Sequence, residues 1–263
     1  MNVARLVAVG STAAALTISS LVVAPSATAE DTAPVITGVD VRPELVGLYA
    51  SGSSPVVVDV DISDDVKVDS VRVTLVAIPR PGDDDVPPDE ATAQASLVSG
   101  TPQEGTWRAT IVLDRHSVTG AWVSEVGVRD SGSNGAFAGR VFDEGYQVDP
   151  IDEFAVKRNT VIRGFNVGEP VSRGSYVRLY GRLLRLDPAS GYVGYRGKTV
   201  QVLFRPAGST TWNLKGTATT DSRGSFTRTG TFRAYRDGVW KVTFAGTDRY
   251  LPETSSGDYV DTR

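Results

Sequence analysis

Strict alternation of apolar and polar residues is the feature that most restricts how this chain can fold. In the stretch 56–62 every even position is apolar, and Asp59 and Asp61 lie at polar positions between them. The same period of two recurs in residues 107–113 and 240–244. Because successive side chains of a β-strand point to opposite faces, this pattern indicates strands with one buried and one exposed face.

Clusters of Gly, Ser, Asp and Asn separate the alternating stretches, as at residues 50–54, 130–135 and 219–224. No window carries a long helical stripe of apolar residues. Short strands punctuated by turn residues are typical of β-sandwiches. The sequence therefore predicts an all-β chain that folds into two tandem antiparallel β-sandwiches.

The charge distribution also predicts two domains, with a boundary in the polar stretch that follows Asp149-Pro150. Residues 30–150 contain 21 acidic and 8 basic side chains, whereas residues 151–263 contain 10 acidic and 18 basic ones. The net charges are therefore −13 and +8. Halves of opposite sign are expected of two domains with different surfaces, and contact between the acidic and basic halves is one expected consequence.

The first 29 residues have the pattern of a cleaved secretory signal peptide. Arg5 precedes an apolar run from Leu6 to Val23, and Ala27-Thr28-Ala29 provides a small-x-small cleavage site. The run contains several Gly, Ser and Thr residues, which suit a membrane-spanning helix poorly. We therefore expect a secreted, extracellular protein without a membrane anchor. It contains no Cys, so neither disulfides nor thiolate metal sites are available to it.

The stretch Leu251-Pro252-Glu253-Thr254-Ser255 comes within one residue of the LPxTG signal that sortases use for covalent attachment to cell walls. Such a signal requires Gly in place of Ser255, followed by a hydrophobic segment and a basic tail. The eight residues after Ser255 are polar instead. We therefore expect that the protein is not sortase-anchored, and that this stretch closes a loop before a last strand.

Three Trp residues each follow a Gly by two positions, in Gly105-Thr106-Trp107, Gly120-Ala121-Trp122 and Gly238-Val239-Trp240. Each Trp is in register with apolar neighbours on its strand. Core packing at the start of a strand is thus favoured over an exposed platform for stacking sugars.

Acidic residues give two candidate calcium sites, because Ca²⁺ binds six to eight oxygen ligands. One candidate is the end of the first sandwich, where interstrand loops gather; the residues there are Asp61, Asp64, Asp65 and Asp130. The weaker candidate is the loop with Asp83, Asp85 and Asp89, whose spacing does not match an EF-hand. No cofactor is otherwise expected, and calcium is the one candidate. The alternative at both places is a solvated acidic loop.

The basic half offers a candidate anion-binding face, formed by Arg178, Tyr180, Arg182 and Lys198. The first three share one parity on a predicted strand. Cell-wall polyanions or anionic glycans are possible partners through their phosphates or carboxylates. The alternatives are a solvated face or docking against the acidic half. No feature suggests sequence-specific nucleic-acid binding.

Catalysis is not expected. His116 is the only histidine, lies in a predicted loop, and has no G-x-S-x-G element to form a triad with. A glycosidase needs only two carboxylates at a suitable separation, so a polysaccharide-degrading or carbohydrate-binding protein remains an alternative.

Two parts of the chain resemble bacterial immunoglobulin-like (Ig-like) domains. The stretch GAWVSEVGVRDSGSNGA, residues 120–136, is similar to the penultimate strand and turn of such domains. The stretches GEPVSRGSYVRLYGRL, GKTVQVLFRPAGSTTW, TTDSRGSF, DGVWKVTFAGT and GDYVDTR resemble the C-terminal Ig-like domain of exported actinomycete-type two-domain proteins. The resemblance covers most of residues 160–263. It implies tandem Ig-like β-sandwiches and an extracellular address, but no activity.

These observations together predict a secreted, non-catalytic binding or structural module at or outside the cell envelope. A calcium-stiffened Ig-like module is the second interpretation.

Overall fold

The computed structural model describes residues 31–79, 89–141, 146–169 and 171–263. Within these ranges the chain forms twenty β-strands and no helix, which confirms the all-β prediction. No helix that could cross a membrane was found there. The predicted signal peptide, residues 1–29, and the acidic residues Asp83 and Asp85 lie outside the described ranges.

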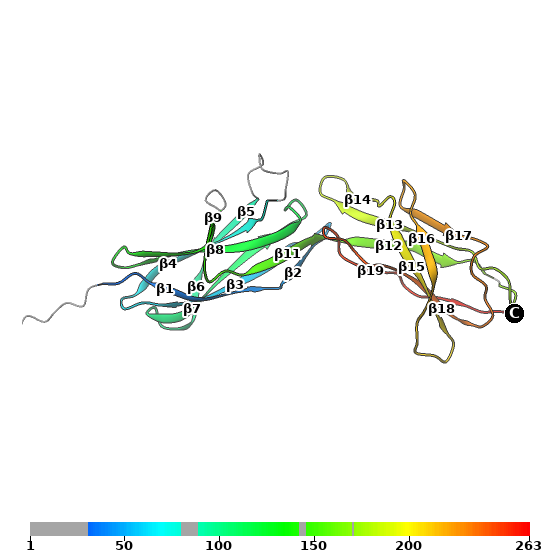
Figure 1. The fold of residues 1–263 in the computed structure, drawn as a ribbon, viewed down its shortest axis with the longest axis horizontal. Helices are drawn as coiled ribbons and strands as arrows, with labels where there is room; N and C mark the ends of the chain where they lie inside the picture. The colour runs from blue at the N-terminus through cyan, green and yellow to red at the C-terminus, as the bar shows by residue number, and fades with distance from the viewer. Residues whose placement is uncertain (1–30, 80–88, 142–145, 170) are drawn as a thin grey trace, which may run out of the picture. The chain divides into compact units, whose positions relative to one another are not determined.

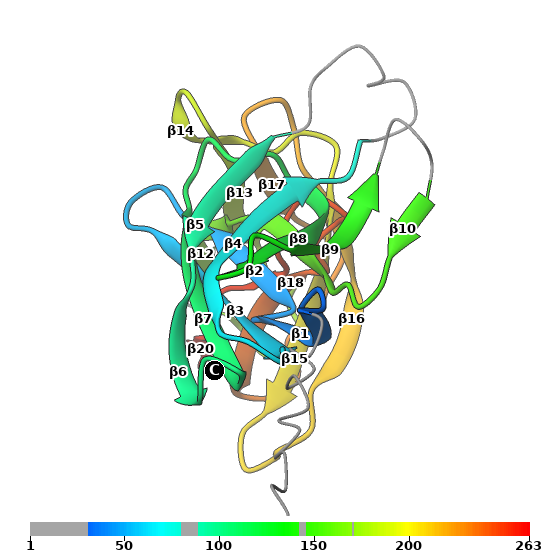
Figure 2. The same cartoon turned by 90° about the vertical axis from the view of Figure 1, so that its left-hand side faces the viewer.

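The first sandwich consists of two sheets packed face to face, which Figures 1 and 2 show as two layers. One sheet has the order β1-β3-β7-β6, with β1 (Val35–Arg42), β3 (Ser54–Ser63), β7 (Glu104–Leu113) and β6 (Ser96–Gly100). The other sheet is centred on β8 (Gly120–Asp130). It also contains β2 (Leu45–Leu48), β4 (Val68–Ala77), β5 (Glu90–Gln94), β9 (Gly135–Val141), β10 (Tyr146–Val148) and β11 (Glu153–Arg158).

Strand β8 organises the second of these sheets. It pairs with β4 along one edge, and with β11 and then β9 along the other. The pairs are antiparallel, as predicted, apart from the parallel pair β2–β11. These two strands lie more than 100 residues apart in the sequence, so no hairpin turn dictates that they run in opposite directions.

The alternating residues form the core of the first sandwich. On β3 the side chains of Val56, Val58 and Val60 are fully buried, while those of Asp59 and Asp61 point away from the core. Burial of such aliphatic side chains contributes about 1.5–3 kcal/mol each relative to exposure. The alternation read from the sequence is therefore the physical basis of this sheet.

The end of the first sandwich differs from the boundary expected after Pro150. Strand β11 lies beyond that point, yet it hydrogen-bonds to β8 and β2 of the first sandwich, and Phe154 and Val156 join the first core. Strand β12, in the second sandwich, begins at Thr160. The polar composition of residues 149–153 marks a turn into the last strand of the first sandwich, because apolar residues resume immediately after it.

The second sandwich also has two sheets. In one, β13 (Leu179–Asp187) lies between β12 (Thr160–Val167) on one edge and β17 (Ser225–Arg228) and β14 (Gly191–Gly194) on the other. The other sheet contains β16 (Asn213–Thr219), β15 (Thr199–Pro206), β18 (Gly238–Phe244), β19 (Glu253–Thr254) and β20 (Asp258–Val260). Its core is separate from the first and includes Leu179, Val202 and Trp240.

The three Gly-x-Trp elements place Trp in the cores, as predicted: Trp122 and Trp240 are 1% exposed and Trp107 is 9% exposed. Two of the preceding glycines, Gly105 and Gly238, are needed for close packing. A Cβ at Gly238 would lie 2.6 Å from the Phe204 ring, and one at Gly105 would lie 2.6 Å from the Leu97 side chain. Real Cβ atoms do not approach other atoms so closely.

The stretch that resembles a sorting signal is part of the second sandwich. Glu253 and Thr254 pair with β18, and the buried Ser255 hydroxyl accepts a 3.0 Å hydrogen bond from the Val242 N–H. Val260, in the last strand, is fully buried. These residues therefore serve as structural elements of the sheet.

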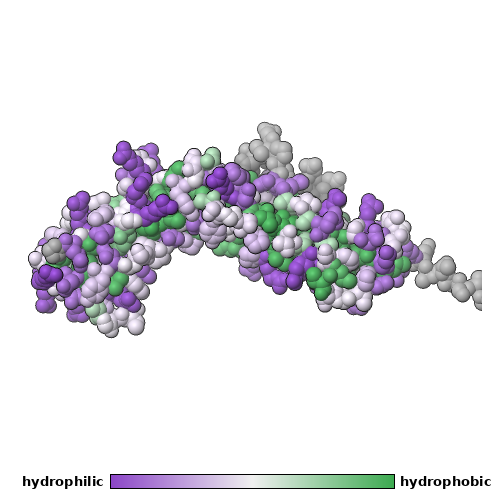
Figure 3. Space-filling view, turned by 180° about the vertical axis from the view of Figure 1, so that it is seen from behind, coloured by the Kyte–Doolittle hydropathy of each residue, from purple (hydrophilic) through white to green (hydrophobic). Residues whose placement is uncertain are grey.

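Figure 3 shows the surface from behind, where hydrophobic residues form separate patches between hydrophilic ones.

Candidate functional site

An arginine-lined hollow lies on the outer face of the sheet formed by β12, β13 and β17. Its volume is about 390 Å³. We call it the arginine hollow; the residues that line it are Arg163, Gly164, Arg178, Tyr180, Gly181, Arg182, Ser225, Phe226 and Thr227. Three of the four predicted anion-binding residues are therefore brought together.

The alternation of β13 and of the residues before it explains why these side chains share one face. Leu179, Gly181 and Leu183 point into the core, so Arg178, Tyr180 and Arg182 point outward. Gly181 faces the core, where a Cβ would lie 2.6 Å from the Phe226 ring, so the strand has no room for a larger residue there.

Strand pairing adds a third arginine that the sequence pattern did not place in the site. Arg163 on β12 lies directly opposite Arg182 on β13. The register shifts immediately after Arg163, and Gly164 adopts a positive φ of 59°. A Cβ at Gly164 would meet nothing within 4 Å. The hollow is thus open beside the arginine pair.

The positive charge of the hollow has no acidic partner among its described lining residues. The Arg182 Nη2 atom donates a 3.1 Å hydrogen bond to the Arg223 carbonyl. The guanidinium carbons of Arg163 and Arg178 lie 5.3 and 6.0 Å from the ring centres of Tyr192 and Tyr180. Like charges directly opposite each other on a sheet are destabilising. An arriving anion would relieve this repulsion.

Lys198 does not line the arginine hollow. Its ammonium lies 4.8 Å from the centre of the Tyr195 ring, and its backbone N–H donates to the Thr220 hydroxyl. Parity along one strand could not locate Lys198, because it precedes β15 of the other sheet. Arg163 lines the hollow instead, because the register of β12 and β13 places it opposite Arg182.

The predicted calcium residues divide into separate groups. Asp64, Asp65 and Asp130 lie at one end of the first sandwich, and Asp31 joins them. The buried Asp130 carboxylate accepts hydrogen bonds of 2.8 and 3.0 Å from the backbone and side chain of Asn134. The Asp64 carboxylate oxygens are inaccessible to solvent and accept no hydrogen bond of good geometry from the described residues.

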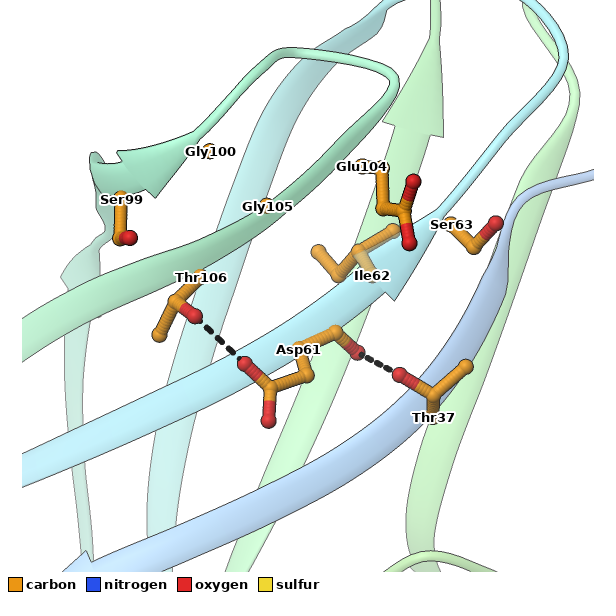
Figure 4. Close-up of a pocket in the computed structure, with 9 residues that line it drawn as sticks. All are labelled: Thr37, Asp61, Ile62, Ser63, Ser99, Gly100, Glu104, Gly105 and Thr106. Carbon is orange, nitrogen blue, oxygen red and sulfur yellow. Dashed lines mark hydrogen bonds between the residues drawn. The ribbon is translucent and has the colours of Figure 1, made fainter.

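Asp61 lies apart from this group, on the outer face of β3. Figure 4 shows its carboxylate accepting a 2.6 Å hydrogen bond from the Thr106 hydroxyl, in a hollow that Glu104 also lines. The end of β3 explains this separation. Asp61 is still within the strand, whereas Asp64 follows the strand end. Asp89 accepts a 2.9 Å hydrogen bond from the Val118 N–H.

In the described ranges, no three Asp, Glu or His side chains are arranged to hold a metal ion. Calcium binding by this chain therefore stays a prediction. His116 is exposed, and its described side-chain contact is with the neighbouring Arg115 Nε, 3.2 Å from His116 Nε2.

Replacing Asp64 by Asn is expected to raise the melting temperature at pH 7 in the presence of EDTA. Burial and the nearby charge of Asp130 raise the pKa of Asp64. A raised pKa means that the folded state becomes less stable as the pH rises above the unfolded value of 3.8. The amide removes this pH-dependent loss, which thermal unfolding between pH 3 and 8 would detect.

Asp69→Asn is the matched control, because the Asp69 side chain is 62% exposed and its replacement removes the same charge from the same domain. A lower melting temperature for Asp64→Asn than for this control would contradict the expected repulsion. The same measurement tests calcium: a stabilisation of the wild-type chain that EDTA reverses would support an ion, and no shift at millimolar calcium would exclude one.

Comparisons with known proteins show no family for this chain. No protein-family description matches the chain, and no curated protein matches it. One similar structure is a tetra-tandem repeat from the extending region of a large adhesion protein, which is 14% identical in sequence. The match covers 82% of this chain and 48% of the repeat chain, with a TM-score of 0.31. The D0–D1 domain of intimin is 12% identical over 86% of this chain and 99% of its own, with a TM-score of 0.28.

Red sea bream transglutaminase is also similar, with 10% identity over 86% of this chain and a TM-score of 0.36. The chain spans about half the length of the adhesion-protein repeat and about a third of the transglutaminase.

Proposed function

We propose that this protein is a secreted, non-catalytic binding module that attaches to anionic polymers at or outside the cell envelope through the arginine hollow. The observation that carries the proposal is the direct opposition of Arg163 and Arg182, with Arg178 beside them and no acidic residue in the described lining. Such an arrangement costs stability in the free protein and gains interaction energy when an anion binds.

Phosphate and carboxylate are the ligand groups that suit the hollow. The planar guanidinium group donates two parallel hydrogen bonds to either of them, which a lysine cannot do. Tyr180, 41% exposed, adds an aromatic surface beside Arg178. The hollow is open, so it fits repeating groups along a polymer more readily than an enclosed small molecule.

Co-sedimentation with purified cell walls tests this function. The secreted chain should pellet with walls, and pelleting should weaken as salt rises, because exposed charges are screened over about 10 Å at 0.1 M salt. The double variant Arg163→Gln/Arg182→Gln should reduce the bound fraction roughly tenfold, as expected for the loss of charge-assisted hydrogen bonds.

The control is Arg196→Gln/Arg236→Gln, which removes the same charge from exposed arginines outside the hollow. Equal loss in both double variants would show that net charge alone drives attachment. Salt-independent pelleting, or none, would contradict the proposal. Docking of the hollow onto the acidic domain is the competing interpretation, and it predicts that the hollow variant lowers thermal stability without any change in pelleting.

A further inference from the structure

A second groove lies on the outer face of the first sandwich, across β5, β4, β8 and β9. Its volume is about 730 Å³, within the range of small-molecule sites. The side chains that matter here are Arg72, Arg129, Phe137, Gln94 and Ser70, around the backbone of Gly127. None of the predicted site residues belongs to this groove.

Strand register builds the groove. Gln94, Arg72, Gly127 and Phe137 form one row across the four strands, each opposite the next. Gly127 has no side chain, and a Cβ at its position would meet nothing within 4 Å. The row therefore contains a gap between a guanidinium on one side and an aromatic ring on the other.

Phe137 provides a flat apolar surface beside this gap. Its Cζ atom lies 2.7 Å from the position that a Cβ on Gly139 would occupy, so the ring leans along β9 over a residue without a side chain. The side chain nevertheless remains 42% exposed. The same Cβ position lies 2.9 Å from the Glu125 Cγ atom, so one edge of the ring leans towards Glu125. The exposed part of the ring is suited to stacking against the apolar face of a sugar ring.

The two arginines of the groove carry charge that no described ion pair neutralises. One orientation of the Gln94 side-chain amide satisfies both of its polar atoms. In it the amide nitrogen donates to the Val71 carbonyl at 3.0 Å, and the amide oxygen accepts from Arg72 Nε at 3.3 Å. This contact holds the Arg72 side chain while its terminal nitrogens remain available. Arg129 lies one row further along β8, opposite Ser70. No Asp or Glu is present among the described residues that line the groove.

This positive spot is unusual because the first half of the chain has a net charge of −13. A general polyanion would be repelled by the rest of that domain, since surface potentials act over the whole face. A single carboxylate on a largely uncharged ring would meet the two arginines at less cost. The charge pattern therefore favours a monovalent acidic group over a densely charged polymer.

We propose that this groove binds an acidic sugar residue of a polysaccharide, a uronic acid or its chemical equivalent. Phe137 stacks on the apolar face of the sugar ring, and Arg72 and Arg129 receive its carboxylate. The hydroxyl of Ser70 is placed to hydrogen-bond the sugar hydroxyls. The site is independent of the arginine hollow, which lies in the other sandwich.

Binding of methyl galacturonoside, a uronic acid glycoside with a single carboxylate, to the protein, measured by calorimetry and by amide NMR shifts, tests the proposal. The measurement uses the Arg163→Gln/Arg182→Gln background, so that the arginine hollow does not contribute. Arg72→Gln, Arg129→Gln and Phe137→Ala should each weaken binding roughly tenfold. Arg115→Gln is the matched control for charge in the same domain and should leave the affinity unchanged.

Two further chemical probes separate the possible outcomes. The methyl ester of this glycoside should bind at least roughly tenfold more weakly, because it lacks the charge; equal affinity would overturn the requirement for an acidic group. Inorganic phosphate should not compete at equal concentration. If Phe137→Ala has no effect, or if phosphate competes fully, the groove is a simple anion site and the saccharide assignment is wrong. Unchanged affinity in all three groove variants, with folding verified by circular dichroism, would place the binding elsewhere.

Discussion

Replacing Trp240 by Ala is expected to destabilise the second sandwich by about 3–5 kcal/mol, the largest effect of any single substitution considered. Trp240 is 1% exposed, and its ring centre lies 4.8 Å from that of Phe204 and 6.1 Å from that of Phe232. Removing the indole leaves a cavity between these two rings and the facing sheet. Differential scanning calorimetry should show a transition lowered by roughly 15 °C or more for a domain of this size.

The two cores are separate clusters, so the transition of the first sandwich should change little. Trp212→Ala is the positional control: this Trp lies partly exposed between Arg205 and Lys241, and its loss should cost much less. Trp240→Phe should also cost less than Trp240→Ala, because the phenyl ring fills part of the cavity. Neither substitution removes a hydrogen bond, since the Trp240 indole N–H has no acceptor among the described residues. A Trp240→Ala chain as stable as Trp212→Ala would contradict the assignment of Trp240 to the core.

Replacing Asp59 by Ala is expected to lower the stability of the first sandwich by about 1–2 kcal/mol. Asp59 is only 14% exposed and connects two strands to its own. It accepts bonds of 2.6 and 2.8 Å from Arg108 on β7, and it also pairs with Arg42 on β1. Because both arginines are about half exposed, solvent screens part of the interaction, and the expected cost stays moderate.

The same interaction predicts a pH dependence. The hydrogen bonds from Arg108, opposed by partial burial and supported by the charges of Arg108 and Arg42, hold the pKa of Asp59 below its unfolded value of 3.8. A lowered pKa contributes stability that is present above the unfolded pKa and is lost as the pH falls towards the folded one. Asp59→Asn should therefore flatten the decline in stability below pH 3.8.

Asp61→Ala is the matched control, since it removes the same charge from the same strand but loses a single hydrogen bond to Thr106. Chemical denaturation at pH 7 and pH 3 would separate the two variants. Equal stability of Asp59→Ala and Asp61→Ala at pH 7 would show that the three-strand ion pairing contributes nothing.

The period of two in the sequence was enough to predict the long strands and their buried sides. It placed Val56 and Val58 in one core and Trp240 in the other, and it put Arg178 and Arg182 on a common outer face. These conclusions need only the geometry of a single strand, in which parity fixes the side to which each residue points. For the same reason the Gly-x-Trp elements could be assigned to the cores without knowledge of their partners.

Register and strand partners were decided by the tertiary structure alone. Arg163 and Arg182 are 19 positions apart in the sequence and become neighbours only because β12 pairs with β13 in one register. The attachment of β11 to the first sandwich likewise depends on pairing with β2, more than 100 residues earlier. Such long-range choices arise from packing two complete sheets, and local alternation contains no information about them.

The acidic end of the first sandwich shows the same division. Composition indicated that Asp61, Asp64 and Asp130 could meet, but Asp61 is held on the sheet face by Thr106 while Asp64 lies beyond the strand end beside Asp130. The sequence by itself thus determined which side chains are polar and outward. The tertiary structure decided which of them share a site, because cross-strand pairing sets the distance between residues that the chain keeps apart.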